Sequence, residues 1–176
     1  MENGSSGVRG GVTEAMRLHA DAVYRVLRIH LKERADVEDA FQDVFIRLLE
    51  THTVFESEEH RKAWLLRTAI NRSRDFYRSF WRRRVGSIEE MEIPWEDERE
   101  IGVMDAVMSL PPKWRDLIHL YYYEGYRVPE LARMLGKKEN TLHSDLHRAR
   151  KALKRKLGGD WDEEGIQDGD GPGSGG

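Results

Sequence analysis

The sequence contains no cysteine, and none of its stretches approaches the roughly 18 consecutive apolar residues of a membrane-spanning helix. The lack of cysteine excludes disulfides, thiolate metal ligands and cysteine nucleophiles. The N-terminus also lacks the apolar segment of a secretion signal. We therefore expect a cytoplasmic protein without membrane insertion.

Apolar residues are scarce as well, at 39% of the 176 residues against 35% for charged residues. This length suits one domain or two small ones, and the few apolar residues must gather on the inner faces of small helical units. Of the 16 glycines, 12 fall in the two ends, which we expect to be flexible. Only Gly86, Gly102, Gly125 and Gly136 interrupt the part between them, as is typical of a helix-rich body.

The formal net charge of −3 argues, taken alone, against a nucleic-acid partner. The charge is unevenly distributed, however: it is +3 over residues 1–84, −7 over 85–105, +7 over 106–157 and −6 over 158–176. Two basic bodies therefore alternate with two acidic segments, and the first acidic segment contains Pro94, which favours a linker.

The predicted fold class is all-α, with two small helical domains joined by an acidic flexible linker. The predicted divisions are a flexible N-terminus (1–11), a first helical domain (12–84), the linker (85–105), a second domain with a helix-turn-helix (106–157), and a disordered acidic, glycine-rich tail (158–176).

Two amphipathic helices are predicted at the start of the first body. The first begins after Thr13 as a plausible N-cap, and its apolar stripe consists of Met16, Ala20, Val23, Tyr24, Leu27 and Leu31. The second begins at Asp36 as a cap, and its apolar series consists of Val37, Ala40, Phe41, Val44, Phe45, Leu48 and Leu49.

The other face of this second helix is mostly polar and acidic. It carries Glu38, Asp39, Gln42, Asp43, Ile46 and Arg47. An ordinary solvated face and a protein-binding face both account for this mixture of acids with an exposed isoleucine.

The segment of residues 61–84 also has two faces when it is wound as a helix. One is apolar and carries Leu65, Leu66, Ala69, Ile70, Ser73, Phe76, Tyr77 and Phe80; the other carries Arg67, Asn71, Arg74, Arg78 and Arg82. Guanidinium groups spaced one helical turn apart are best explained by a polyanionic partner, and the asparagine among them is able to read a base edge. The alternative is an exposed arginine-rich helix paired with local acids such as Asp75.

The second body has the pattern of a helix-turn-helix. Pro112 begins one helix, which continues through Trp114, Leu117, Ile118 and Tyr121 to Gly125. A short helix follows from Pro129, with Leu131, Ala132 and Leu135 inward, and Gly136 supplies the left-handed turn. The last helix begins at Asn140 as its N-cap and buries Leu142, Leu146, Ala149, Leu153 and Leu157.

This arrangement favours a last helix that lies in the major groove of DNA over the alternative of a merely soluble three-helix unit. We expect His143, Ser144, His147 and Arg148 to reach base edges, with Arg148 gripping guanine through two hydrogen bonds. Phosphates would be met by Lys137, Lys138, Lys151, Lys154 and Arg155.

Together, these segments resemble the extracytoplasmic-function (ECF) group of RNA polymerase sigma factors, within the sigma-70 family. Residues 35–50 resemble the region 2 helix that docks on the polymerase β′ clamp helices, and residues 63–78 resemble the segment that reads the −10 promoter element. Residues 109–126 and 131–153 resemble region 4, which reads the −35 element and contacts the β flap.

The resemblance implies a factor that binds core polymerase and directs promoter-specific initiation, with an anti-sigma factor as a further partner. The implied core-docking residues are Glu38, Asp39, Gln42, Asp43 and Ile46. The implied DNA contacts are Arg67, Asn71, Arg74, Arg78 and Arg82 for the −10 element, and Lys137, Lys138, Asn140, His143, Ser144, His147, Arg148 and Lys151 for the −35 element.

The sequence departs from the family pattern at three places. Arg127 stands where a serine or threonine usually caps the first helix of the motif, which predicts a looser helix start. His143 and Asp145 stand where basic residues are common, and the Asp145 carboxylate, expected to face DNA, would repel phosphate or accept from cytosine N4. The loop Thr51–His60, equivalent in position to the loop that captures a base, is acidic, with Glu56, Glu58 and Glu59.

No catalytic constellation or cofactor site is predicted, so the chain is not expected to be an enzyme. His143 and His147 have the spacing of a zinc pair, but no glutamate of an HExxH motif lies between them and both belong to the predicted DNA-reading helix. The alternative function is an autonomous helix-turn-helix regulator that is not a polymerase subunit. The acidic docking helix and the arginine-rich helix of the first body favour the sigma factor.

Overall fold

The computed structural model describes residues 4–83 and 98–158, which fall into two compact units, Met1–Ile93 and Pro94–Gly176. Within the described ranges every regular element is a helix, which confirms the predicted all-α class. The residues 84–97, which hold most of the predicted linker, and the tail residues 159–176 lie outside the described residues.

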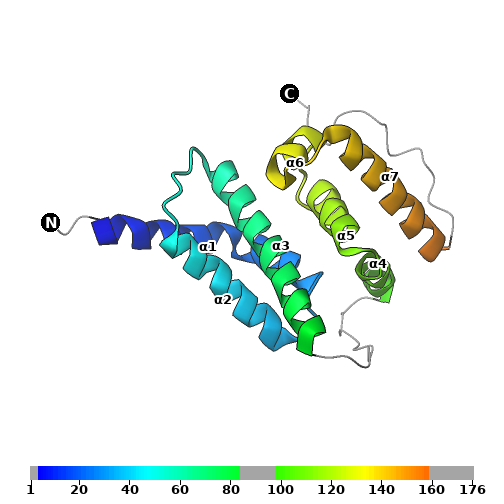
Figure 1. Ribbon diagram of the computed structural model, residues 1–176, viewed down its shortest axis with the longest axis horizontal. Coiled ribbons are helices and arrows are strands. Elements are labelled where there is room, and N and C mark those ends of the chain that lie inside the picture. Colours follow the sequence, from blue (N-terminus) through cyan, green and yellow to red (C-terminus); the bar gives the residue numbers. More distant parts are fainter. Residues whose placement is uncertain (1–3, 84–97, 159–176) are drawn as a thin grey trace. The chain divides into compact units, whose positions relative to one another are not determined.

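The first unit consists of α1 (Gly4–Arg28), α2 (Arg34–Glu50) and α3 (Glu58–Arg83), each of which packs against the other two (Figure 1). Their shared core is made of small and branched aliphatic side chains. It contains Val23, Val26 and Leu27 from α1, Val37, Ala40, Val44 and Leu48 from α2, and Leu65, Leu66, Ala69 and Ile70 from α3.

The predicted apolar stripe of α1 is partly wrong. Met16 and Tyr24 are exposed, at 40% and 37%, while Ala15, Ala22 and Val26 are buried. Because α1 packs against two helices, its buried arc is set by both neighbours, and a single stripe of three- and four-residue steps does not locate that arc. The N-cap prediction also fails for Thr13, because the helix begins nine residues earlier and includes residues 4–11, which were expected to belong to a flexible N-terminus.

The apolar series of α2 was predicted closely, but its start was not. Val37, Ala40, Val44, Phe45 and Leu48 are buried as expected, and Leu49 is exposed at 45%. The helix begins at Arg34, and the extended residue before it makes no side-chain capping bond. Asp36 therefore lies in the first turn of α2 and not at the cap. In the first turn, its negative charge still suits the positive end of the helix dipole.

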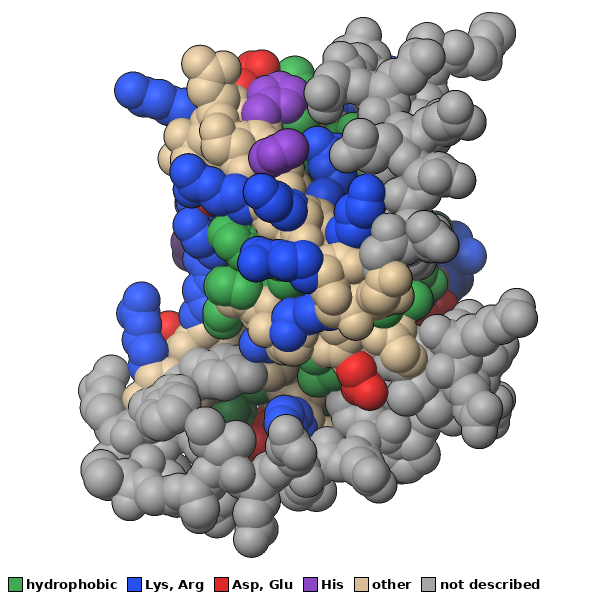
Figure 2. Space-filling model, turned by 90° about the vertical axis from the view of Figure 1, so that its right-hand side faces the viewer, with side chains coloured by type: hydrophobic (Ala, Val, Ile, Leu, Met, Phe, Trp, Pro, Cys, Tyr) green, Lys and Arg blue, Asp and Glu red, His purple; other side chains and the backbone are tan. Residues whose placement is uncertain are grey.

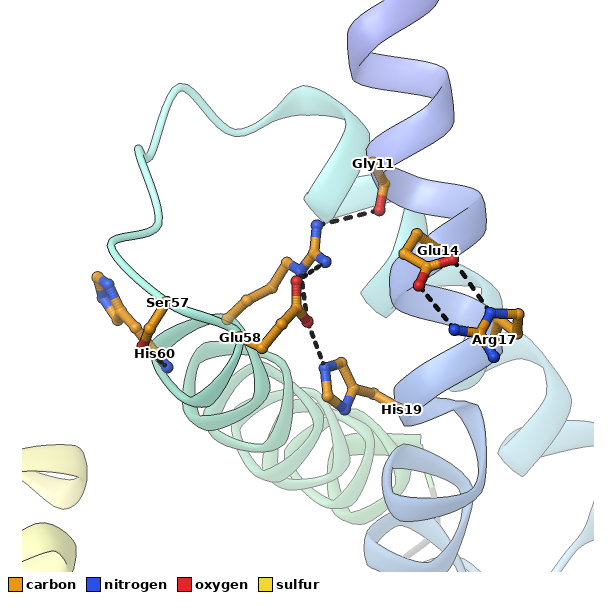
Figure 3. A network of polar contacts seen from close by, with 8 residues as sticks. Gly11, Glu14, Arg17, His19, Ser57, Glu58 and His60 are labelled. Carbon is orange, nitrogen blue, oxygen red and sulfur yellow. Dashed lines mark hydrogen bonds and ion pairs between the residues drawn. The ribbon is translucent and has the colours of Figure 1, made fainter.

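A polar network joins the beginning of α3 to α1 (Figure 3). The Glu58 carboxylate lies 2.9 Å from Nε2 of His19 and also pairs with the Arg61 guanidinium, which donates to the carbonyl of Gly11 at 3.2 Å. Hydrogen bonding to His19, followed by the contacts with Arg61, lowers the pKa of Glu58 below its ordinary value of 4.5. The network therefore holds the N-terminal half of α1 against α3 with a carboxylate that stays charged.

The apolar face of α3 agrees with the prediction. Leu65, Leu66, Ala69 and Ile70 are buried. Ser73 is buried among them, and its hydroxyl donates to the carbonyl of Ile70 at 2.8 Å, which satisfies a polar group inside the core. The side chains of Tyr77 and Phe80 lie outside the described residues.

The second unit consists of α4 (Glu98–Met108), α5 (Pro112–Ile118), a π-helical turn η1 (His119–Tyr123), α6 (Val128–Leu135) and α7 (Glu139–Lys156). Helix α7 packs against α5, α6 and α4. The core residues Leu117, Leu120, Leu131, Leu142, Leu146 and Ala149 are buried as the helix-turn-helix pattern requires.

Two element boundaries differ from the prediction. Helix α4 begins at Glu98 and packs on α5 and α7, so residues 98–105 are helical where the linker was expected to continue. The acidic composition of this segment favoured a linker, although the segment forms an amphipathic helix that buries Ala106. Asn140 lies inside α7, because the extended residue Lys138 precedes the helix and makes no side-chain capping bond.

The turn residues of the motif behave as their chemistry requires. Gly136 has φ 64° and ends α6 in the left-handed conformation, which costs glycine nothing. At the start of α6, the backbone N–H of Arg127 donates to the Glu130 carboxylate at 2.8 Å. Glu130 thus supplies the reciprocal half of a capping box, so the helix start is held despite the missing serine or threonine.

Candidate functional site

A basic stripe runs along the exposed side of α3. Arg67, Asn71 and Arg78 are exposed and Arg74 is partly exposed, at successive steps of four, three and four residues. The structure therefore places four members of the predicted −10 set on one face, while the side chain of Arg82 lies outside the described residues. Such a stripe can follow a phosphate backbone, and the asparagine amide can donate to and accept from a base edge.

The exposed side of α7 carries the second group of candidates. His143, Ser144, His147, Arg148 and Lys151 are all exposed, and their leucine neighbours in the sequence point into the core. Lys137 and Lys138 in the turn and Asn140 in the first turn of α7 are exposed as well. Lys and Arg side chains gather in a band on the face that Figure 2 shows, with two histidines at one end. This face can present base-reading groups flanked by phosphate contacts.

The expectation that Asp145 faces DNA is wrong. Its side chain is only 4% exposed, and its carboxylate oxygen Oδ1 accepts from Nε1 of Trp114 at 3.2 Å and from Nζ of Lys113 at 3.3 Å. On the helical wheel Asp145 lies beside Leu142 and Ala149, on the edge of the buried arc, where α5 covers it. The exposed side of α7 is thereby free of this negative charge.

A metal site was considered for the two histidines of α7. In residues 4–83 and 98–158, no group of three or more histidine, aspartate or glutamate side chains is arranged to hold a metal ion. His143 and His147 stand side by side on the exposed face together with Ser144 and Arg148. Their position fits the nucleic-acid face better than a metal centre.

The candidate docking face lies on α2. Glu38, Asp39 and Gln42 are exposed, and Ile46 is 46% exposed, so an apolar side chain stands among acids and amides on the surface. Two of these acids are paired: Glu38 with Arg34 one turn earlier on α2, at 2.7 Å, and Asp43 with the guanidinium of Arg72 on α3. The predicted set is therefore one continuous face, but one of its acids already serves to join α2 to α3.

Asp36, at the beginning of α2, lies close to other negative charges. Burial raises the pKa of Asp36, and the neighbouring carboxylates of Glu33 and Asp39 raise it further. The beginning of α2 thus carries several negative charges close together. Such a surface favours a basic protein partner.

Sequence reasoning missed two features of these surfaces. Leu49 was assigned to the core of α2 but lies exposed one turn after Ile46, so the docking face is more apolar than predicted. Trp114 was assigned to an apolar face, but its indole nitrogen also binds a buried carboxylate. The sequence did contain a signal for the bond between Trp114 and Asp145. Asp145 lies within the leucine series of α7, and Trp114 lies in the helix that covers it.

Within the described ranges, no helix is long and apolar enough to cross a membrane.

Comparison with known families identifies both units. Residues 15–83 match the family model "Sigma-70 region 2", and residues 102–153 match "Sigma-70, region 4". The first match begins within α1 and reaches the end of α3, and the second begins within α4 and ends within α7. The two candidate nucleic-acid faces therefore fall in different regions of one family.

Curated relatives agree with these matches. The chain is 29% identical over 158 residues to the ECF RNA polymerase sigma factor SigM of Mycobacterium tuberculosis, covering 87% of this chain and 80% of that protein. It is 31% identical over 156 residues to SigE of Mycolicibacterium smegmatis, covering 82% of this chain and 60% of that protein. It is 27% identical over 156 residues to SigX of Bacillus subtilis, covering 79% of each.

Solved structures support the fold. The sigma factor RpoE of Bartonella quintana, solved with the anti-sigma factor NepR, has a TM-score of 0.67 at 21% identity, covering 85% of this chain and 98% of that one. CnrH, solved with the cytosolic domain of CnrY, has a TM-score of 0.66 at 24% identity, covering 89% and 93%. These comparisons give no support to an autonomous regulator. The chain belongs to the sigma-70 family, in the extracytoplasmic-function group of RNA polymerase sigma factors.

Proposed function

We propose that this sigma factor binds core RNA polymerase through α2 and directs initiation by reading two promoter elements, the −10 element with α3 and the −35 element with α7. The observation that carries the proposal is the presence of two exposed basic helix faces in two separately packed units. A DNA-binding module with one reading helix would need only one of them. Two readers on one chain suit a promoter with two separated elements.

The −35 element is assigned to the face of α7. A helix that follows a glycine turn and a short helix enters the major groove with its first turns against the bases. His143, Ser144, His147 and Arg148 lie in these turns, and Arg148 can donate two hydrogen bonds to a guanine. Lys137, Lys138 and Lys151 then flank the groove at the phosphates, with Asn140 in the first turn beside them.

The −10 element is assigned to the stripe of α3. Arg67, Arg74 and Arg78 supply positive charge along one side of a helix of 26 residues, and Arg82 continues their spacing in the sequence. Their guanidinium planes bind phosphate and also stack on exposed bases, so the stripe suits a strand that has separated from its partner. Asn71 is the member with the amide chemistry for a base edge.

The polymerase-docking role is assigned to α2. Glu38, Asp39 and Gln42 surround the apolar side chain of Ile46, and Leu49 extends that apolar patch. Such a patch with an acidic surround fits a basic helical surface such as the β′ clamp helices, and the second unit would contact the β flap. Asp43 is expected to contribute less, because it pairs with Arg72.

The proposal also covers partners and location. The two similar solved structures each contain a second protein, an anti-sigma factor in one case and the cytosolic domain of CnrY in the other. We infer that an anti-sigma factor restrains this chain as well. Because its template is promoter DNA and its enzyme is core polymerase, the chain would act in the cytoplasm. It would carry no cofactor and hydrolyse no nucleotide itself.

Reconstituted run-off transcription tests the proposal. Core polymerase with and without the chain is given a library of candidate promoters, and the transcripts are sequenced. We expect discrete start sites that appear only when the chain is present. A parallel reaction with Asp39→Lys at the same concentration is expected to give fewer transcripts from the same start sites, because docking is weakened. The absence of promoter-specific transcripts with the unaltered chain would refute the proposal.

A further inference from the structure

Asp145 is a buried carboxylate in the middle of the helix assigned to −35 reading. Its residue surface is 3% exposed, and the buried residues around it on α7 are Leu142, Leu146 and Ala149. A charged group in such a position is unfavourable unless hydrogen-bonding partners compensate for lost water. The partners of Asp145 therefore indicate what the carboxylate is for.

Both partners come from the first turns of α5. Trp114 Nε1 donates to Oδ1 of Asp145 at 3.2 Å, and the ammonium group of Lys113 lies 3.3 Å from the same oxygen. The Lys113 nitrogen also stands 5.8 Å from the centre of the Trp114 ring, and its side chain is half exposed. The three side chains thus form one compact group that joins the start of α5 to the middle of α7.

This group lies directly beside the base-facing residues. Ser144 precedes Asp145, and His147 and Arg148 follow it by two and three positions, all of them exposed. Side-chain ends lie about 5–6 Å from the axis of a helix, so a rotation of α7 by about 20° would move them by about 2 Å. A displacement of this size breaks hydrogen bonds to base edges, whose lengths fall within about 2.7–3.2 Å.

We propose that Asp145 is a positioning residue for −35 recognition. Its carboxylate, held by Trp114 and Lys113, fixes the rotation of α7 about its own axis and so determines how selectively Ser144, His147 and Arg148 read their bases. This proposal rests on the assignment of α7 to the −35 element. It goes further because it names a residue that touches no DNA as a determinant of specificity.

The effect is expected in selectivity rather than in overall attraction. Contacts to base edges are directional and depend on the exact rotation of the helix. Contacts from Lys137, Lys138 and Lys151 to phosphates are long, flexible and tolerant of small shifts. Loosening α7 should therefore reduce the difference between a promoter and a scrambled sequence, while the number of neutralised phosphates stays the same.

The test compares full-length variants in the reconstituted holoenzyme. Trp114→Phe removes the indole donor and keeps an aromatic ring, Asp145→Leu removes the acceptor, and Asp145→Asn keeps an acceptor oxygen for Trp114. The probe is a promoter duplex selected by the unaltered chain, together with the same duplex carrying a scrambled −35 element. Binding is measured at several salt concentrations, below the melting temperature of each variant.

We expect the ratio of promoter to scrambled affinity to fall about tenfold in Trp114→Phe and in Asp145→Leu. Asp145→Asn should keep most of the ratio, and the slope of affinity against salt should be unchanged in all three. Combining Trp114→Phe with Asp145→Leu should add little, because either change already removes the group. If Asp145→Leu fails to fold, Trp114→Phe and Asp145→Asn decide the outcome alone.

Two results would overturn the positioning role: an unchanged ratio in Trp114→Phe, or equal losses of affinity for both duplexes. A different result would refute the proposed function, namely that the unaltered chain selects no promoter with a defined −35 element. A chain that selects such an element, with variants that select it equally well, refutes only the role of Asp145.

Discussion

In each unit a carboxylate holds the helix that we propose to read DNA, and the two carboxylates lie in opposite environments. In the first unit, Glu58 lies exposed at the beginning of α3 and binds His19 and Arg61. In the second, Asp145 lies buried in the middle of α7 and binds Trp114 and Lys113. A network around an exposed carboxylate adds modest stability that depends on pH and salt, whereas one around a buried carboxylate fixes geometry. We therefore expect Glu58 to affect the stability of the first unit and Asp145 to affect the selectivity for promoter sequence.

The largest expected effects test whether the two units fold independently. Leu66→Ala in α3 and Leu142→Ala in α7 each remove a leucine with no exposed surface. Each should destabilise its own unit by about 2–5 kcal/mol, because the loss of burial and the cavity add together. Thermal unfolding followed by hydrogen exchange should show the loss in one unit only. A loss spread equally over both units would contradict the division.

Within the second unit, the next effect separates base contacts from phosphate contacts. Arg148→Ala should cost about 1–3 kcal/mol at a single base position of the −35 element. Lys151→Ala should weaken binding to every sequence and lower the salt slope by about one. Both affinities are measured on a panel of −35 substitutions with the holoenzyme. Identical patterns for the two variants would argue against the roles assigned to them.

A comparable effect is expected on the docking face of the first unit. Asp39→Lys should weaken core polymerase binding about tenfold or more, because it places a positive charge opposite a basic partner. Asp21→Lys on α1 is the matched control, since Asp21 is also exposed but lies on another helix. Co-purification with core polymerase gives the readout. Equal losses in both variants would mean that net charge, rather than this face, governs binding.

The smallest effect is expected for Glu58, whose exposed carboxylate contributes to the stability of the first unit. Because His19 and then Arg61 lower the pKa of Glu58, the unfolded chain takes up a proton on this group at a higher pH than the folded chain. The contribution of Glu58 to stability is therefore present above the ordinary value of 4.5 and is lost as the pH falls through the lower folded pKa. Glu58→Gln should lower the stability of the first unit at neutral pH and flatten its decline in acid.

The control for this change is Glu59→Gln, which alters an equally exposed carboxylate in the same turn of α3. Both substitutions remove one negative charge from the positive end of the helix dipole. Any difference between them in acid unfolding curves therefore reports the network with His19 and Arg61. If the two variants unfold alike at every pH, the network contributes nothing beyond the dipole.

Much of the fold could be predicted because leucine and valine spacing records which side of a helix is buried. The series in α2, α3 and α7 placed Val44, Ile70 and Leu146 in the core, and Gly136 marked the turn of the motif. Once the buried side of each helix was predicted, the residues on its opposite side could be predicted to be exposed. The exposed faces that carry the candidate DNA contacts could therefore be predicted from sequence, and the two family models match residues 15–83 and 102–153.

The remaining errors have physical causes that lie outside any single helix. Thr13 and Asn140 have good capping side chains, but each lies inside a helix that begins earlier. Met16 is exposed because two neighbouring helices decide the buried arc of α1. Asp145 looked like a surface acid because its partners lie 31 and 32 residues away on another helix. The spacing within α7 marks an aspartate among buried leucines, but it does not show which distant residues pair with it.

We propose that α3 and α7 read different promoter elements, and a promoter library randomised at both elements separates the two roles. Transcripts are sequenced from holoenzymes carrying the unaltered chain, Asn71→Ala or Arg148→Ala. We expect Asn71→Ala to relax preferences only within the −10 element and Arg148→Ala to relax them only within the −35 element. Changes at both elements with either variant, or at neither, would contradict it.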